Sequence, residues 1–409
     1  MTDIGAFPAL ALTHARIITP EEEIEEGTVV LEEGRIVQVG ANPPPPSAEA
    51  FDLRGLIVAP GFIDLHVHGG GGFSLASGDL EQSRSFAQWA VGTGVTSFLV
   101  TPIGRDRDDI LRQIWASRPL MAGVREGAQP LGFHIEGPFL SPERPGAFRP
   151  EWLVEPSVEE FRAYLDAAGE HLRLFSLAPE LPEAEAVIAE AVAAGVVVGL
   201  AHSDATYEEA QRAFSLGVRH VTHCYNGMRL FHHRDPGCLA AALNSRDVTV
   251  ELIADGVHVH PGAMEMLLRA KGLERTVLVT DANPLAGLAD GSFDLAGERI
   301  YVEDGVARRA DGTLAGSAFT MDRMVANVAR WLPVGLRGAI RMATLNPALV
   351  IGLAGRKGRI APGFDADLVV LAPDLEVEMT FAGGDLVYRR PYPSAIDDSQ
   401  ASSLARRSA

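Results

Sequence analysis

The fold is most constrained by a repeated alternation of short apolar runs with longer stretches rich in Ala and Glu. Eight runs have the composition of strands: "FIDLHVH", "VTSFLVTP", "LGFHIEGP", "LRLFSLAPE", "VVVGLAHSD", "HVTHCYN", "VTVELIADG" and "TVLVTDAN". They recur about every 30 residues, the length of one strand and helix unit, which predicts an α/β protein built as a (β/α)8 TIM-type barrel. A doubly wound open sheet is the alternative, but the "GGGG" after the first run lacks the dinucleotide-binding spacing.

The two ends of the chain differ in sequence pattern from the repeated middle part. Residues 9–58 contain short β-prone runs, interrupted by four prolines at 43–46 that exclude a central strand. Similar runs return in residues 356–389. Because chain ends often lie close together, we expect residues 1–58 and 356–392 to form one small β-sandwich domain. Residues 59–355 would then form the barrel, and residues 393–409 a flexible tail.

Charge and cysteine content limit the partners and the compartment. A net charge of -19 repels polyanions, so we expect no binding to nucleic acid or to an anionic membrane. No apolar run is long enough to span a bilayer, and Asp3 stands where a signal peptide would be basic. Cys224 and Cys238 are too few for a disulfide framework, so we expect free thiols and a cytoplasmic protein.

Polar side chains stand at or just beyond the C-terminal end of each expected strand. They are His66, His68, Thr101, Glu136, Glu180, His202, Asp204, His223, Asn226, Asp255, His258, Asp281 and Asn283. In a closed parallel barrel these ends surround one opening, where active sites of this architecture lie. A single histidine on a strand is usually a satisfied core group, but histidine and acidic residues repeated at the same height predict a shared site. Imidazole and carboxylate together suit zinc, iron or manganese.

His66 and His68 are separated by one residue on the first expected strand. Strand side chains alternate with a period of two, so both imidazoles face the interior and can serve one ion. The four glycines that follow allow the backbone to pass close to an ion or a substrate. The alternative for these glycines is a mobile loop.

The sequence resembles the amidohydrolase superfamily and, more closely, the N-acetylglucosamine-6-phosphate deacetylases, from about Ala15 to Arg389. The first motif alone indicates only the superfamily, whereas the set is specific for the closer family. The motifs are "APGFIDLHVHGGGG", "HIEGPFLSPERPGAF", "LAPE", "AHSDATYEEA", "THCYNGMRLFHHRDPG", "VELIADGVHVHP", "LVTDAN", "DGTLAGS" and "GRIAPGFDADLVV".

The resemblance implies a role for each of several matched residues. Glu136, His202 and His223 match the principal metal ligands, and three protein ligands leave a coordination position open for water. Asp281 matches the catalytic aspartate, which takes a proton from the attacking water and gives it to the leaving amine. His258 matches a residue that polarises the substrate carbonyl or stabilises the oxyanion.

His66 and His68 match positions that hold a second metal in some relatives. The resemblance therefore implies one or two divalent ions per subunit, with zinc as the expected metal and iron, manganese or cobalt as alternatives. Some binuclear relatives bridge their metals with a carboxylated lysine. The only lysines here, Lys271 and Lys357, lie away from the strand ends, so we expect Glu136 to bridge.

Substrate contacts follow from the same resemblance. Arg234, in the basic loop 229–237, matches the arginine that binds a sugar phosphate, for which a guanidinium fork is well suited. Without the resemblance this loop would be equally well explained as a solvated segment with incidental charge. In relatives the loop reaches the neighbouring subunit, which favours a homodimer. The remaining implied contacts are Ala147, Phe148, Asn226, Gly227, His258, Leu314, Ala315, Gly316 and Ser317.

One position departs from the family pattern. Phe148 stands where relatives usually have a histidine, and phenylalanine can stack on a sugar face but cannot donate a hydrogen bond. The residues therefore constrain deacetylation more tightly than 6-phosphate specificity. Asn283 and Pro284 beside Asp281 are also unusual for the family.

The leading hypothesis is a metal-dependent hydrolase that converts N-acetylglucosamine 6-phosphate into glucosamine 6-phosphate and acetate. An alternative is a deacetylase of another N-acetyl amino sugar or of an N-acyl amino acid. A non-catalytic barrel scaffold is a third hypothesis. The presence of Glu136, His202, His223 and Asp281 together argues against it.

Overall fold

The computed structural model describes residues 9–124, 126–295 and 298–391, so the expected tail at 393–409 lies outside the described residues. The expected parallel barrel is confirmed: eight strands pair in the order β6, β9, β10, β11, β12, β13, β14, β15, each parallel to its neighbour. Each of the eight sequence runs overlaps one of them, and β10 and β13 begin two residues before their runs. Their bounds are β6 (Phe62–Asp64), β9 (Val95–Val100), β10 (Gln129–Glu136), β11 (Leu172–Leu177), β12 (Val197–Leu200), β13 (Val218–Val221), β14 (Thr249–Ile253) and β15 (Thr276–Val279).

The barrel closes where the first strand meets the last. Asp64 at the end of β6 accepts hydrogen bonds from the backbone N–H (3.3 Å) and the hydroxyl (2.5 Å) of Thr280, directly after β15. Just above, the Asp281 N–H donates to the carbonyl of His66 (2.9 Å). The closure therefore places side chains separated by more than 200 residues at the same height.

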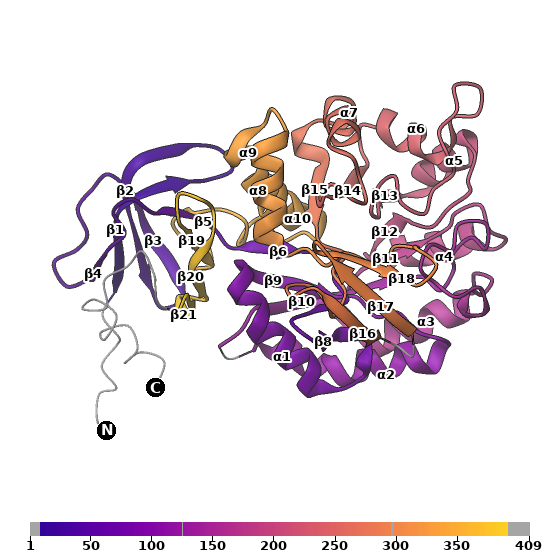
Figure 1. The fold of residues 1–409 in the computed structure, drawn as a ribbon, viewed down its shortest axis with the longest axis horizontal. Helices are drawn as coiled ribbons and strands as arrows, with labels where there is room; N and C mark the ends of the chain where they lie inside the picture. Colours follow the sequence, from indigo (N-terminus) through magenta and orange to yellow (C-terminus); the bar gives the residue numbers. More distant parts are fainter. Residues whose placement is uncertain (1–8, 125, 296–297, 392–409) are drawn as a thin grey trace.

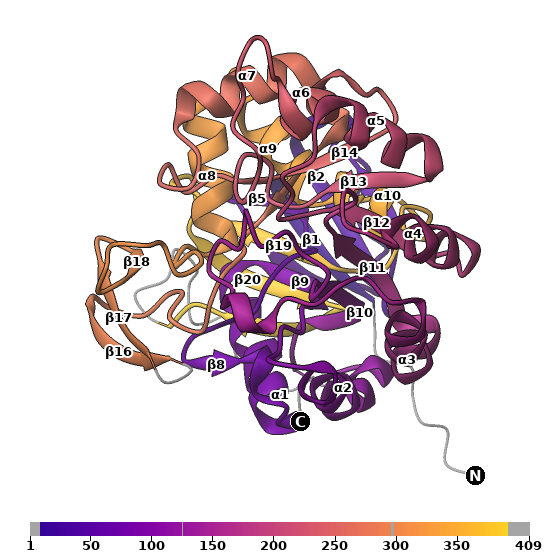
Figure 2. The same cartoon turned by 90° about the vertical axis from the view of Figure 1, so that its right-hand side faces the viewer.

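Ten helices are described in the chain, and they surround the strands (Figure 2). Apolar side chains from both layers interdigitate, with Phe98, Phe133 and Phe175 fully buried between strands and helices. Several helices begin at a side chain that caps the first turn; Thr206 and Glu209 form a reciprocal capping box on α5. The helices are α1 (Leu80–Ala90), α2 (Arg107–Ser117), α3 (Val158–Ala168), α4 (Ala184–Ala193), α5 (Tyr207–Leu216), α6 (Gly237–Asn244), α7 (Pro261–Lys271), α8 (Met321–Trp331), α9 (Gly335–Ala343) and α10 (Leu345–Val350).

Both chain ends contribute to one small domain beside the barrel (Figure 1). The ends join where β5 pairs antiparallel with β19, within a single hydrogen-bonded sheet of eight strands that encloses its own apolar core. The path is β21, β20, β19, β5, β1, β2, β3, and β4 pairs with β1. The bounds are β1 (Leu10–Ile18), β2 (Glu23–Glu32), β3 (Arg35–Gly40), β4 (Glu49–Asp52), β5 (Ile57–Pro60), β19 (Leu368–Leu371), β20 (Val377–Ala382) and β21 (Asp385–Arg389).

Two further sheets lie near the barrel opening. The glycines after His68 form a short hairpin, β7 (Gly69–Gly70) with β8 (Phe73–Ser74), whose turn donates hydrogen bonds to the carbonyls of Ala286 and Pro284. Between β15 and α8 the chain adds an antiparallel sheet of β16 (Gly291–Leu295), β17 (Glu298–Glu303) and β18 (Val306–Arg309), which projects to one side in Figure 2. The sequence analysis did not anticipate this second sheet.

Within the described ranges, no helix combines the length and the apolar character needed to cross a membrane.

Candidate metal centre and active site

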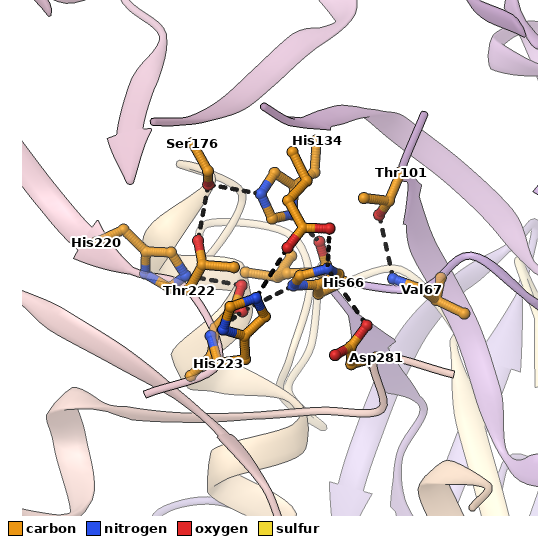
Figure 3. A network of polar contacts seen from close by, with 12 residues as sticks. His66, Val67, Thr101, His134, Ser176, His220, Thr222, His223 and Asp281 are labelled. Carbon is orange, nitrogen blue, oxygen red and sulfur yellow. Dashed lines mark hydrogen bonds and ion pairs between the residues drawn. The ribbon is translucent and has the colours of Figure 1, made fainter. Parts of the chain in front are cut away.

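Glu136, at the end of β10, lies at the centre of the polar side chains above the barrel core. Its Oε1 is 2.8 Å from His223 Nε2 and 3.2 Å from His202 Nε2. Its Oε2 is 3.3 Å from Nε2 of both His66 and His68. The two oxygens of one carboxylate thus face two different pairs of imidazoles. Figure 3 shows the side chains of His66, His223 and Asp281 pointing toward one another.

These side chains form two groups with the geometry of a metal site. Glu136, His202 and His223 each offer a ligand atom within 4.8 Å of the others. His66, His68 and Asp281 do the same, with Asp281 Oδ1 at 3.3 Å from His68 Nε2. All five residues assigned to metal binding from the sequence therefore come together.

Three of the strand ends turn through a left-handed residue. His202, His223 and Asp281 have φ angles of 43°, 29° and 47°. Non-glycine residues rarely adopt this conformation, and it is concentrated at functional sites, where surrounding contacts hold it in place. Backbone strain is therefore part of what aims these side chains inward.

His202 and His68 are held so that Nε2 is free. Nδ1 of His202 lies 2.9 Å from the Arg144 carbonyl, and Nδ1 of His68 lies 3.2 Å from the Thr101 carbonyl. A carbonyl only accepts, so each Nδ1 carries a hydrogen and Nε2 is the nitrogen that can bind a metal once it carries no proton. A Cβ at Gly146 or Gly227 would lie 2.6 Å from the His202 ring, so only glycine leaves room for it.

A second layer of buried polar groups lies beneath the ligands, and the sequence analysis missed it. Glu251, in the middle of β14, is fully buried. Its Oε2 accepts from His66 Nδ1 (3.0 Å) and from the His223 N–H (2.9 Å), and its Oε1 accepts from His220 Nε2 (3.0 Å). The available signal was an acidic residue inside the otherwise apolar strand "TVELI".

His134 belongs to the same layer (Figure 3). It precedes Glu136 by two residues on β10, so it points to the same face, one level deeper. With His66 and Glu251 it forms a third group of potential ligands. However, its ring nitrogens already bond the Leu65 carbonyl (3.0 Å) and the Ser176 hydroxyl (2.8 Å), so this group supports the site.

The buried carboxylate of Glu136 is held in its ionised form and the imidazole of His68 in its protonated form, so positive charge is needed at this site. Burial alone would raise the pKa of Glu136, but the charge on His66 and hydrogen bonds from His202 and His223 hold that pKa well below its usual value. Burial alone would lower the pKa of His68, but hydrogen bonds to Asp281 and Glu136 raise it to about 9. Protons on imidazole thus balance carboxylate charge that a divalent ion would otherwise balance. The donor set fits such an ion.

The catalytic assignments also fall at one cavity of about 420 Å³ above the metal-binding groups. Asp281 lies on its wall; burial alone would raise its pKa, but the His66 charge and the His68 hydrogen bond lower it. His258 Nδ1 lies 2.5 Å from Asp255 Oδ2, which fixes the ring. Predicted substrate residues on the wall are Ala147, Phe148, Asn226, Gly227, His258, Leu314, Ala315 and Gly316.

Two predicted substrate residues do not line this cavity. Ser317 is buried, and its N–H donates a hydrogen bond to the Asp281 carbonyl (3.0 Å). It therefore holds the backbone of Asp281 and does not face the cavity. Arg234 lies on the exposed loop and its Nη1 is 2.8 Å from His233 Nε2. Neither lysine approaches the ligands, because Lys271 bonds the Ala242 carbonyl and Lys357 pairs with Asp367.

Some strand-end residues support neighbouring loops instead of facing the cavity. Glu180 accepts from Ser203 Oγ (2.8 Å) and from the Asp204 N–H (2.6 Å), and Asp204 pairs with Arg144 and Arg229. Neither carboxylate lines the cavity.

Two arginines that the sequence analysis did not single out line the cavity, Arg149 and Arg309. Arg309, at the end of β18, donates from Nη2 to the Ala147 carbonyl (2.9 Å) and so ties the added sheet to the loop after β10. The Arg149 guanidinium lies 5.3 Å from the Trp152 ring centroid. No periodic signal marks either residue, since both lie outside the repeated strand ends.

Asn283, two residues after Asp281, connects this part of the chain to residues 314–317. Its amide donates to the Ala315 carbonyl, and its Oδ1 accepts from the Leu285 N–H at 2.7 Å. The unusual residue beside Asp281 therefore shapes the wall of the cavity.

In comparison with known proteins, this chain is similar to deacetylases of N-acetylated sugar phosphates. The amidohydrolase family model matches residues 57–387. The N-acetylglucosamine-6-phosphate deacetylase of Lysinibacillus sphaericus is 33% identical over 378 residues, 92% of this chain and 97% of that protein. The N-acetylgalactosamine-6-phosphate deacetylase of Escherichia coli O157:H7 is 36% identical over 374 residues, 91% of this chain and 97% of that protein.

A solved structure gives the same likeness in three dimensions. It is an aspartate-to-alanine mutant of the N-acetyl-D-glucosamine-6-phosphate deacetylase of Mycobacterium smegmatis, in complex with N-acetyl-D-glucosamine-6-phosphate. It matches with a TM-score of 0.88 at 34% identity, over 93% of this chain and 100% of that chain.

Metal affinity should depend on pH in a defined direction. Because the pKa of His68 is raised to about 9, an ion that binds at His68 below pH 9 must displace a proton. We expect affinity at this position to rise by at least about tenfold per pH unit between pH 7 and 9, because the pKa of His66 is also raised and its proton is displaced as well. Titrations with chelator-buffered zinc at several pH values measure this slope. A His68→Ala variant should show a shallower slope, and a flat wild-type profile would contradict the expectation.

Proposed function

Because the chain belongs to the amidohydrolase family, we propose that it hydrolyses the acetamide bond of N-acetylglucosamine 6-phosphate. The products are acetate and glucosamine 6-phosphate. The observation that carries the proposal is the carboxylate of Glu136 between two pairs of imidazoles, beside Asp281, on the floor of a cavity of about 420 Å³. Ordinary substrate pockets have this size.

Two divalent ions fit the donor groups. We propose that Glu136, His202 and His223 hold one ion and that His66, His68 and Asp281 hold a second, with Glu136 between them. Zinc is the expected metal, and iron, manganese or cobalt suit the same ligands. A bound ion would polarise the acetyl carbonyl and make water more acidic.

The remaining chemistry belongs to the side chains of the cavity wall. Asp281, whose pKa is lowered, is an ionised carboxylate that takes a proton from the water attacking the acetyl carbon. The same proton then passes to the sugar nitrogen as the C–N bond breaks, which releases the amine and acetate. Protonated on both nitrogens, with Nδ1 held by Asp255, His258 would donate from Nε2 to the carbonyl oxygen as charge develops there.

Release of free amine is the direct test of the proposal. Purified protein incubated with N-acetylglucosamine 6-phosphate should release amine and acetate in equal amounts. A chelator should stop the reaction and added zinc, manganese or cobalt should restore it, because the carbonyl is otherwise too weakly polarised. Absence of amine release at every metal loading would contradict the proposed function.

The role of Asp281 is tested by Asp281→Asn. The amide keeps the shape of the side chain but cannot accept the proton, so we expect kcat to fall by about 10²–10⁴-fold. Substrate binding, measured by calorimetry, should change much less, and metal at Glu136, His202 and His223 should remain. Wild-type turnover in this variant would mean that another group is the base.

We also propose a homodimer in which Arg234 completes the cavity of the partner subunit. Arg234 does not line the cavity of its own subunit. It lies on a loop where Leu230 and Phe231 are 77% and 61% exposed to solvent. Large exposed apolar side chains on one loop are typical of an interface. We propose a cytoplasmic location, which the free buried thiols of Cys224 and Cys238 support.

Arg234→Ala should separate phosphate recognition from catalysis. Loss of a charge-assisted hydrogen bond is expected to raise KM for the phosphorylated sugar by about 10–100-fold. KM for unphosphorylated N-acetylglucosamine should be unchanged, and this comparison is the internal control. Arg309→Ala is the matched variant within the subunit's own cavity. If only Arg309→Ala weakens binding of the phosphorylated sugar, the phosphate is bound within one subunit and the assignment of Arg234 is wrong.

The 4-epimer, N-acetylgalactosamine 6-phosphate, is the second candidate substrate. The relative from Escherichia coli O157:H7 named for that sugar is 36% identical to this chain, within the range of 33% to 37% of relatives named N-acetylglucosamine-6-phosphate deacetylase. Phe148 lies edge-on to His202, with ring centroids 5.2 Å apart, so it gives this wall an apolar surface. Comparing kcat/KM for the two epimers, and for an N-acetyl amino acid, decides between these substrates.

A further inference from the structure

Glu251 is a buried carboxylate that connects both groups of proposed ligands from below. It lies inside the barrel on β14 and is fully buried. One of its oxygens receives the His66 ring N–H at 3.0 Å and the His223 backbone N–H at 2.9 Å. The other receives the ring N–H of His220, whose second nitrogen is 2.7 Å from Thr249 Oγ1.

We propose that Glu251 is a positioning residue whose negative charge, at a hydrogen bond that keeps the His66 hydrogen on Nδ1, strengthens His66 Nε2 as a donor and so controls occupancy of the His66 and His68 metal position. An ionised carboxylate can only accept, so the bond to Glu251 keeps the hydrogen of His66 on Nδ1. Nε2 then faces Glu136 Oε2 at 3.3 Å and Asp281 Oδ1 at 3.6 Å, and an ion that displaces its proton gains its lone pair. This inference rests on the proposed metal-dependent function.

The four ligand histidines are anchored differently, which makes the inference specific. His202 and His68 are each anchored at Nδ1 by a backbone carbonyl. Among the described residues, only His66 of these four has a carboxylate at the nitrogen that faces away from Glu136. A carboxylate partner makes an imidazole a stronger metal donor than a carbonyl does. Glu251 should therefore act on the His66 and His68 position more than on the other.

A purely structural role for Glu251 is the competing explanation, and Glu251→Gln separates the two. The amide oxygen can replace Oε2 and still accept from His66 and His223. The amide NH₂ then faces His220, which can accept at Nε2 once its hydrogen moves to Nδ1, opposite the Thr249 hydroxyl. The variant thus keeps the hydrogen bonds and removes only the negative charge.

His220→Asn is the matched control. It disturbs the same buried network from the side away from the ligands, since His220 contacts Glu251 Oε1 but no proposed ligand side chain among the described contacts. Any general loosening of the barrel interior should therefore appear in this variant as well. Its thermal midpoint measures that loosening independently of metal.

The experiment is a titration of metal-free wild type, Glu251→Gln and His220→Asn with Zn²⁺ and Co²⁺. Calorimetry and Co²⁺ absorption follow each binding step, and ¹⁵N NMR of the imidazoles reports the His66 tautomer. We expect two ions in wild type. In Glu251→Gln the ion at His66 and His68 should bind about 10–100-fold more weakly while the other is retained. His220→Asn should lower the thermal midpoint and leave both affinities unchanged.

Three outcomes would overturn the inference: a single ion in wild type, unchanged affinities in Glu251→Gln, or a parallel loss of both affinities in the two variants. None of these readouts uses the substrate. A wild type that binds two ions but releases no amine from N-acetylglucosamine 6-phosphate would therefore reject the proposed function and leave the role of Glu251 to the titration.

Discussion

The site depends on closure of the barrel between β6 and β15. Without the pairing of Asp64 with Thr280, and of the Asp281 N–H with the His66 carbonyl, the first and last strands would be the separate edges of an open sheet. His66 and Asp281 would then lie on opposite edges. Closure also explains why the ligands of the second group come from the two ends of the barrel while those of the first come from its middle strands. Barrel closure thus brings the two groups of candidate ligands together on either side of Glu136.

Burying so many ionisable groups is costly unless each has a partner, because desolvation disfavours charge. The structure answers this with two layers. The upper layer leaves the Nε2 atoms of His202 and His68 facing the proposed ion position, and the lower layer, around Glu251 and His134, binds the core-facing Nδ1 of His66. Among the described residues, Nδ1 of His223 has no hydrogen-bond partner. Each left-handed residue adds strain of about 1–3 kcal/mol. The hydrogen bonds of the lower layer help to hold these residues in the strained conformation.

The sequence was sufficient for the repeated part of the molecule and insufficient elsewhere. Spacing predicted the eight strands, and the period of two predicted that His66 and His68 share a face. The two imidazoles do meet, but β6 ends at Asp64 and both residues follow it in the segment that leads to β7. Glu251 carried a detectable signal, a charge within an apolar strand, but its partners depend on the register of neighbouring strands, which spacing does not reveal. The sheet β16 to β18 and Arg309 lie outside the repeat, so no periodicity marks them. In the proposed homodimer, the role of Arg234 depends on a second chain, which no pattern within one chain can specify.

The division between strands and loops bears on how the substrate is chosen. Strand ends hold the groups that any amide hydrolysis of this type requires, and they are fixed by barrel geometry. The residues proposed to recognise the sugar lie instead on loops, Phe148 after β10 and residues 314–316 after β18, and the hydrogen bond from Arg309 to the Ala147 carbonyl joins the two regions. Loops change more readily than the strands that carry them. Relatives named for the two epimeric sugars are about equally similar to this chain, so we expect the choice of epimer to depend on these few loop residues and not on overall identity.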